Sequence, residues 1–250
     1  MGAALRVCLK GLRVLTLAAL GFGLAPAWVQ VWAPAWAQGG TASLVAETVP
    51  VPQGYREALQ WYARAARAGD AQAQYLYGET LARGLGGKAN FKTAANWFEK
   101  AARQGHARAA FALGRAYEAG RGRARDPAMA AKWYAAAAQK DVPEALYNLA
   151  RLHETGMGVD RNLAQAAIFY TRASRAGLAA AQYNLGLLYQ SGRGVPRDLP
   201  RAWAWLSRAK KTGIAVAAKP LARIEGDFSA EEKKRARQIL KEISAVAPTR

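Results

Sequence analysis

The chain has 250 residues, of which 52% are hydrophobic, and its 36 lysines and arginines against 17 aspartates and glutamates give a formal net charge of +19. So large an apolar fraction excludes a wholly disordered chain, because it supplies ample material for a core. The positive charge favours acidic partners, namely nucleic acid, anionic lipid head groups or an anionic envelope polymer.

Residues 1–37 have the pattern of a secretory signal peptide. Three basic residues precede an uncharged apolar run at 14–25, and small residues surround a cleavage site after Ala37. We therefore expect a periplasmic or secreted protein, for which nucleic acid is not an expected partner. The alternative is an uncleaved anchor, which would place the protein at a membrane. The only cysteine, Cys8, would leave with the signal, so the mature chain could form no disulfide.

Residues 38–53 show no helical period and are predicted to be a flexible linker. From residue 54 onward the sequence repeats itself. Alanines and aromatic residues recur at equivalent positions of a fixed period, which indicates an array of equal units. The aromatic pairs follow one another at intervals of 36 residues: Trp61 and Tyr62, Trp97 and Phe98, Trp133 and Tyr134, Phe169 and Tyr170, and finally Trp205 with Leu206 in the aromatic place.

Each unit is predicted to be a pair of short helices joined by a glycine turn. The first helix has apolar residues at three- and four-residue spacing, as in residues 181–192. The second helix begins at a residue type that caps helices and ends at a glycine suited to a left-handed cap. The caps are Asn90, Asp126, Asn162 and Asp198, and the terminal glycines are Gly69, Gly105, Gly177 and Gly213, with Asp141 in the remaining place.

Glycines at alternate positions lie between the two helices of each unit. They are Gly84 and Gly86, Gly120 and Gly122, Gly156 and Gly158, and Gly192 and Gly194. A phosphate-binding loop would need a preceding strand and a lysine followed by serine or threonine, and the sequence has neither. We therefore interpret these glycines as tight turns.

The unit at residues 181–213 closely resembles the Sel1-like repeat, a relative of the tetratricopeptide repeat. The resemblance covers a half repeat and four full repeats at 54–213. It implies an all-α fold, a right-handed α-solenoid of 36-residue helix-turn-helix repeats, and in bacteria a secreted or periplasmic adaptor that binds proteins. Residues 214–250 are predicted to contain C-terminal capping helices, with a capping box at Ser229 and Glu232. Some secreted relatives that are linked to β-lactams are rich in cysteine. The predicted mature chain contains none, so we do not expect that activity.

No constellation of residues points to catalysis or to a bound metal. The two histidines, His106 and His153, lie in different repeats and are interpreted as structural. Nucleophilic catalysis would need a general base beside a plausible serine, and the sequence offers no such pair. We therefore expect neither enzymatic activity nor a cofactor.

Basic residues gather in two columns near the end of the second helices. The columns are Arg64, Lys100, Arg172 and Arg208, and, three residues on, Arg67, Arg103, Arg175 and Lys211. They either complement the helix dipoles or form a continuous basic ridge. The turn at 120–125 adds Arg121, Arg123 and Arg125, which would be the first turn to test against an anionic partner.

The concave face of a solenoid is its usual binding surface, and by analogy with tetratricopeptide repeats the first helices line it. Our main hypothesis is a scaffold that binds a protein or peptide there. The alternative is a binder of anionic envelope polymer or membrane surface through the basic ridge, and a β-lactam or cell-wall hydrolase is a third, disfavoured hypothesis. The candidate concave-face residues are Glu79, Arg115, Glu118, Arg151, Glu154 and Gln190.

Overall fold

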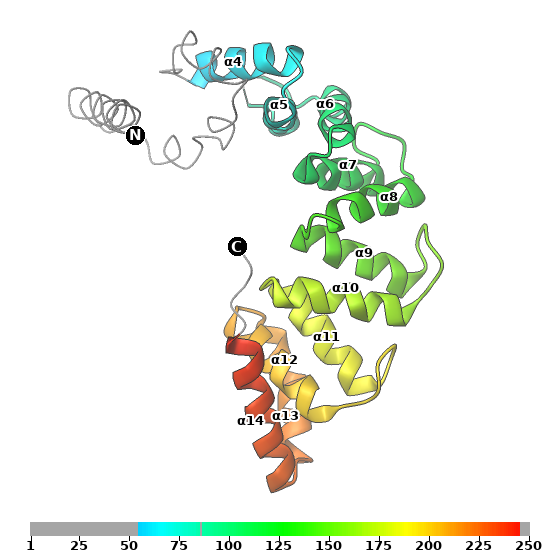
Figure 1. Ribbon diagram of the computed structural model, residues 1–250, viewed down its shortest axis with the longest axis vertical. Helices are drawn as coiled ribbons and strands as arrows, with labels where there is room; N and C mark the ends of the chain where they lie inside the picture. The colour runs from blue at the N-terminus through cyan, green and yellow to red at the C-terminus, as the bar shows by residue number, and fades with distance from the viewer. Residues whose placement is uncertain (1–54, 86, 246–250) are drawn as a thin grey trace, which may run out of the picture. The chain divides into compact units, whose positions relative to one another are not determined.

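The computed structural model describes residues 55–85 and 87–245, and within them every regular element is helical. The predicted signal peptide and linker lie outside these residues. The helices of the repeats follow one another in a single stack (Figure 1), as the sequence predicts for a solenoid. They are α4 (Tyr55–Arg67), α5 (Ala71–Arg83), α6 (Phe91–Arg103), α7 (Ala107–Ala119), α8 (Pro127–Ala138), α9 (Pro143–Thr155), α10 (Leu163–Arg175), α11 (Ala179–Ser191), α12 (Leu199–Lys211), α13 (Ala218–Gly226) and α14 (Ala230–Ala245), with a 3-10 turn at Ala215–Ala217.

The predicted helix starts are confirmed by their capping bonds. The side chains of Asn90, Asp126, Asn162 and Asp198 each accept a hydrogen bond from the backbone N–H three residues on, at 2.9–3.0 Å. These bonds begin α6, α8, α10 and α12, the second helix of each full repeat. The first helices are α5, α7, α9 and α11, of which α7 begins at the less usual cap His106.

The ends of the second helices also agree with the sequence. Gly69, Gly105, Gly177 and Gly213 all have a positive φ, and Asp141, in the equivalent place, has a φ of 53°. An L-residue is strained in that region, although aspartate tolerates it better than most. The chain therefore reverses direction in the same way after each repeat.

The turns between the helices of a repeat hold two glycines with different structural roles; Gly86, the second glycine of the first turn, lies outside the described residues. The first, such as Gly156 at φ 75°, is the left-handed cap of the first helix. The second, such as Gly158 at φ 76°, lies against the backbone at the start of the preceding repeat's second helix, where an added Cβ would be 2.5 Å from Pro127 O. These glycines are thus turns, as predicted, and the second one also lets adjacent repeats approach.

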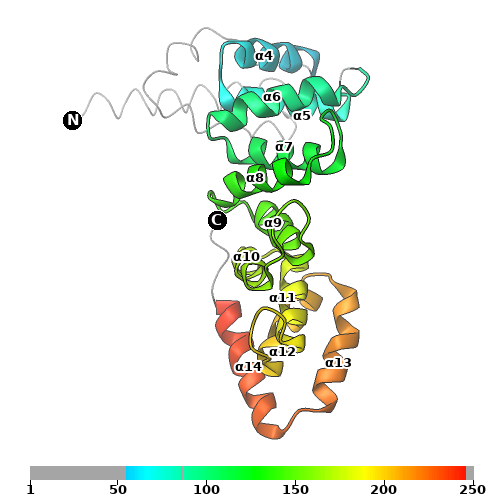
Figure 2. The same ribbon diagram turned by 90° about the vertical axis from the view of Figure 1, so that its right-hand side faces the viewer.

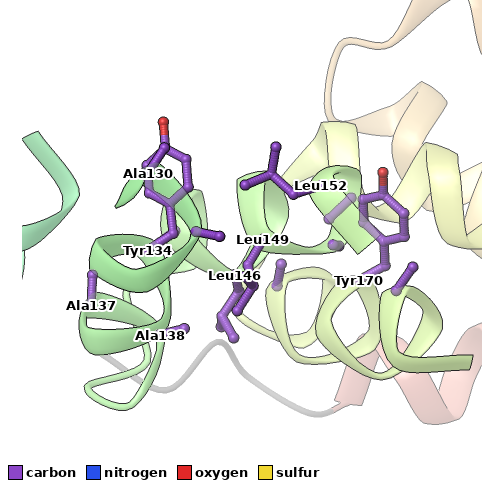
Figure 3. Packing of buried hydrophobic residues seen from close by; sticks show 14 of the residues in the cluster. Ala130, Tyr134, Ala137, Ala138, Leu146, Leu149, Leu152 and Tyr170 are labelled. Carbon is purple, nitrogen blue, oxygen red and sulfur yellow. The ribbon is translucent and has the colours of Figure 1, made fainter. Parts of the chain in front are cut away.

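Buried aromatic and small residues alternate in the core between repeats. Tyr134 and Tyr170 are fully buried, and in Figure 3 they lie parallel with their hydroxyl groups on the same side of the core. The ring of Tyr134 occupies the space beside Gly114, where a Cβ would come within 2.7 Å of it. The alanine column Ala94, Ala130, Ala166 and Ala202 is buried throughout. The repeated residues therefore form the repeated core.

The C-terminal helices pack on the last repeat. In Figure 2, α12 lies between α13 and α14. The predicted capping box begins α14, because Ser229 N donates to Glu232 Oε2 at 2.9 Å and Glu232 N donates to Ser229 Oγ at 3.2 Å. Arg208 of α12 donates to the carbonyl of Ile243, which ties down the last turn of α14. No helix among the described residues is both long and apolar enough to span a membrane.

Candidate functional site

Three helices meet at Glu118, near the end of the first helix α7. The hydroxyl of Tyr134, from α8, donates to Glu118 Oε2 at 2.6 Å. The guanidinium of Arg151, from α9, forms an ion pair with Glu118 Oε1. The Asn148 side chain, also from α9, lies near the Tyr134 hydroxyl and acts to lower its pKa. Two candidate residues from separate repeats, Glu118 and Arg151, are thus brought into direct contact.

The same arrangement returns one repeat later with one change. The hydroxyl of Tyr170 donates to Glu154 Oε2 at 2.9 Å, and Asn184 Nδ2 donates to the Tyr170 hydroxyl at 3.1 Å. The position equivalent to Arg151, 36 residues on, is Leu187. Instead, Arg193 from the following turn lies 3.6 Å from Glu154 Oε1.

The shifted pKa values of these groups keep the network in one protonation state. Burial, and after it the adjacent Glu118 carboxylate, raises the pKa of Tyr134 far above its ordinary value. Burial and then Glu154 do the same to the pKa of Tyr170. Burial alone would lower the pKa of Arg151, but the hydrogen bond and charge of Glu118 outweigh it and raise the pKa. The phenols therefore remain donors, and the arginine remains a cation.

A pocket of about 240 Å³ opens beside Glu154 on the surface of the first helices. Its walls combine a carboxylate and amides with leucine side chains. It is lined by Glu154 of α9, by Asn184, Leu187, Leu188, Gln190 and Ser191 of α11, and by Arg193 of the next turn. A larger hollow of about 1010 Å³ along α14 is walled mainly by charged side chains of that one helix.

Gln190 lines the pocket beside Glu154, whereas the other two candidate residues of the first helices, Glu79 and Arg115, make separate contacts. Glu79 forms an ion pair with Arg83 of its own helix at 3.4 Å. Arg115 is exposed, and its guanidinium lies 5.9 Å from the ring centre of Phe111. We use the term first-helix surface for the set Glu79, Arg115, Glu118, Arg151, Glu154 and Gln190.

The cations of the predicted basic ridge differ in the contacts that they make within the fold, and Lys100 and Arg103 make such contacts while remaining exposed. Arg172 donates to the carbonyl of Ala138 at 2.8 Å and to Asp141 Oδ1 at 2.7 Å, so it binds the end of the preceding second helix. Arg208 binds the end of α14 in the same manner. Lys100 lies 4.3 Å from the centre of the Trp97 ring, and Arg103 pairs with Glu99. The side chains of Arg64, Arg67, Arg175 and Lys211 are exposed.

The arginines of the 120–125 turn make contacts within the fold. Arg123 donates to Glu99 Oε2 at 2.7 Å and is mostly buried. Burial alone would raise the pKa of Glu99, but hydrogen bonds from Arg123 and Arg103 outweigh it and lower the pKa. Arg121 lies over the ring of Phe91, and Arg125 donates to Met157 Sδ at 3.6 Å.

The two histidines have structural contacts. His106 Nδ1 accepts the N–H of Ala109 at 3.1 Å, so its Nε2 carries the proton that is donated to Gln72 Oε1 at 2.7 Å. His153 stacks on Phe169 with ring centres 5.7 Å apart. In residues 55–85 and 87–245, no group of three or more histidine, cysteine or acidic side chains could hold a metal ion.

Sequence reasoning missed the tyrosine network, although the columns contain a signal for it. A carboxylate at the Glu118 position coincides with a tyrosine hydroxyl at the Tyr134 position. The four repeats pair Ala82 with Phe98, Glu118 with Tyr134, Glu154 with Tyr170, and Gln190 with Leu206. Acid and hydroxyl are thus present together or absent together.

A family model for the Sel1 repeat matches residues 48–70, 71–106, 107–142, 143–178 and 179–213. A solved Sel1 repeat protein from Oxalobacter formigenes is similar, with 34% identity, a TM-score of 0.64, and coverage of 69% of this chain and 50% of that one. A protective antigen of uropathogenic Escherichia coli with an SLR fold has 25% identity and a TM-score of 0.52, over 82% of this chain and 52% of that one. The chain thus spans about half the length of these two structures. No curated protein matches it.

Proposed function

Because the chain belongs to the Sel1 repeat family, we propose that it is an exported, non-enzymatic scaffold that binds a protein or peptide along its first-helix surface. The supporting observation is the contrast between the core and this surface. The buried column of Ala94 and its equivalents is identical in every full repeat, whereas the surface column changes from Glu79 to Arg115, Arg151 and Leu187. Variation along a repeated frame suits the recognition of one irregular ligand.

Export rests on the signal-peptide pattern of residues 1–37. Its test is the mass and N-terminal sequence of the protein recovered from the producing cells. A mature N-terminus at Gln38 supports a periplasmic or secreted scaffold. An intact N-terminus in the membrane fraction supports the anchor instead.

The binding surface can be tested with a photo-reactive amino acid placed at single positions in intact cells. Residue 115 replaces an exposed cation of the first helix α7, and residue 132 replaces an exposed cation of the second helix α8. We expect residue 115 to crosslink a discrete protein, identified by mass spectrometry, and residue 132 to crosslink it much less. Equal crosslinking from both positions would contradict the proposed surface.

The second candidate function is the binding of an anionic envelope polymer. Its supporting observation is the exposure of Arg64, Arg67, Arg175 and Lys211 along the basic ridge. Contacts of exposed cations with a polyanion are screened by salt, so this binding should fall steeply between low and moderate ionic strength. Binding in a groove should persist there, which separates the two functions.

A further inference from the structure

We propose that the pocket beside Glu154 binds an arginine side chain of the partner protein, an inference that rests on the proposed scaffold function. The chain itself contains the template for this interaction. At Glu118, a carboxylate already hydrogen-bonded by a buried tyrosine holds the guanidinium of Arg151 from the next first helix. At Glu154, the carboxylate and the tyrosine are present, but the place of that arginine is taken by Leu187.

Glu154 retains capacity for a cation. One of its oxygens accepts the Tyr170 hydroxyl, and the other pairs, within the part of the chain that the structure describes, only with Arg193, at 3.6 Å. The side chain of Arg193 is 49% exposed, whereas that of Arg151 in the template is 34% exposed. Arg193 thus lies at the rim of the pocket, where it can move aside when a guanidinium enters.

The pocket has the size and lining for one long side chain. Its volume of about 240 Å³ is below that of sites for drug-sized ligands, which begin at about 300 Å³. Leu187 and Leu188 form an apolar wall that suits the methylene groups of an arginine. Arginine is favoured over lysine, because its planar guanidinium makes two directed hydrogen bonds where an ammonium acts as a point charge.

The surroundings of the pocket define the residues that flank this arginine. Arg193 and Arg197 follow α11, and Arg161 lies in the preceding turn. The protein as a whole is strongly basic. The ligand must therefore present a cation to Glu154 and negative charge to the surrounding arginines. An arginine within an acidic segment does both, because its acidic neighbours are attracted by these cations while its guanidinium binds the carboxylate.

The test is an NMR titration of the full chain with the acetylated, amidated pentapeptide EGRGE. The control peptides replace its arginine with lysine or with uncharged citrulline. We expect one site, reported by the side-chain amide of Asn184, with weaker binding of the lysine peptide and none of the citrulline peptide. Glu154→Gln should weaken binding about 10- to 100-fold, the range expected for a charged hydrogen bond.

Two substitutions, each of which gives one repeat the residue found at the equivalent position of the other, make the test specific. Leu187→Arg supplies the pocket with its own guanidinium and should abolish peptide binding. Arg151→Leu empties the equivalent place at Glu118 and should create a second site. Glu144→Gln, at an exposed carboxylate of α9 that belongs neither to the pocket nor to the first-helix surface, is the matched control and should leave binding unchanged. Circular dichroism of each variant confirms that its helices remain folded.

The proposal is overturned if the citrulline peptide binds as well as the arginine peptide, if Glu154→Gln binds like the unsubstituted chain, or if Arg151→Leu still has one site. If the peptide does not bind but residue 115 still crosslinks a discrete protein, the arginine pocket is refuted and the scaffold function is retained. Loss of those crosslinks removes the scaffold itself, so the two failures are distinguishable.

Discussion

Gly158 is where one repeat touches the backbone of the repeat before it, and replacing it with alanine should destabilise the solenoid strongly. The added Cβ would lie 2.5 Å from Pro127 O and 2.6 Å from Ala128 N. Both atoms belong to the backbone at the start of α8 and cannot rotate away. The substitution therefore forces a shift between two repeats.

The size of the effect follows from comparison with Gly156, two residues earlier. Its φ of 75° matches the 76° of Gly158, so both alanine variants carry the left-handed cost of roughly 1–2 kcal/mol. At Gly156 the nearest atom to the new Cβ is the side-chain Cβ of Arg161, at 3.2 Å. Gly158→Ala should cost a further 1–3 kcal/mol or so for overpacking.

The assay is equilibrium unfolding in urea, followed by far-ultraviolet circular dichroism. We expect a free energy of unfolding reduced by about 1–2 kcal/mol in Gly156→Ala and by about 2–5 kcal/mol in Gly158→Ala. Equal losses in the two variants would refute the reasoning, because only Gly158 has the backbone of another repeat against it.

Three further predictions concern side chains. Tyr134→Phe removes the donor to the half-buried Glu118 and should lower the free energy of unfolding by about 1–3 kcal/mol, measured in urea. His106 must be neutral to cap α7, and burial lowers its pKa. Its contribution to the free energy of unfolding is therefore complete above its ordinary pKa and is lost as the pH falls through the lowered pKa. His106→Asp keeps a cap at acid pH and should reduce the loss of unfolding free energy measured between about pH 7.5 and pH 5. Arg208→Ala releases the last turn of α14 and should speed hydrogen exchange there while α5 and α7 stay protected; equal acceleration throughout would contradict this local role.

The helices and turns were predictable because their signals are local. Asp126 caps α8 with an atom only three residues from the N–H that it accepts, and Gly105 is needed where φ is positive. The 36-residue period then placed each unit beside the next. Local capping signals and the repeat period together were therefore enough to predict the fold.

The site was less predictable because its contacts join distant columns. Glu118 meets Tyr134 across 16 residues and Arg151 across 33, distances at which neither helix periodicity nor capping gives information. The basic columns show the same limit. Sequence placed Arg172 and Arg175 on one helix face, but only the structure shows Arg172 bound to a carbonyl of the preceding second helix.

The central claim, a partner bound on the first-helix surface, is tested most directly by the affinity of the crosslinked partner for two charge-matched variants. Arg115→Glu changes that surface, whereas Lys132→Glu changes the net charge equally on a second helix. Arg115 is preferred to Arg151, because Arg151 also holds Glu118. We predict a loss of about tenfold or more, as for an interface hot spot, in Arg115→Glu alone. Equal losses in both variants would contradict the claim and indicate binding through net charge.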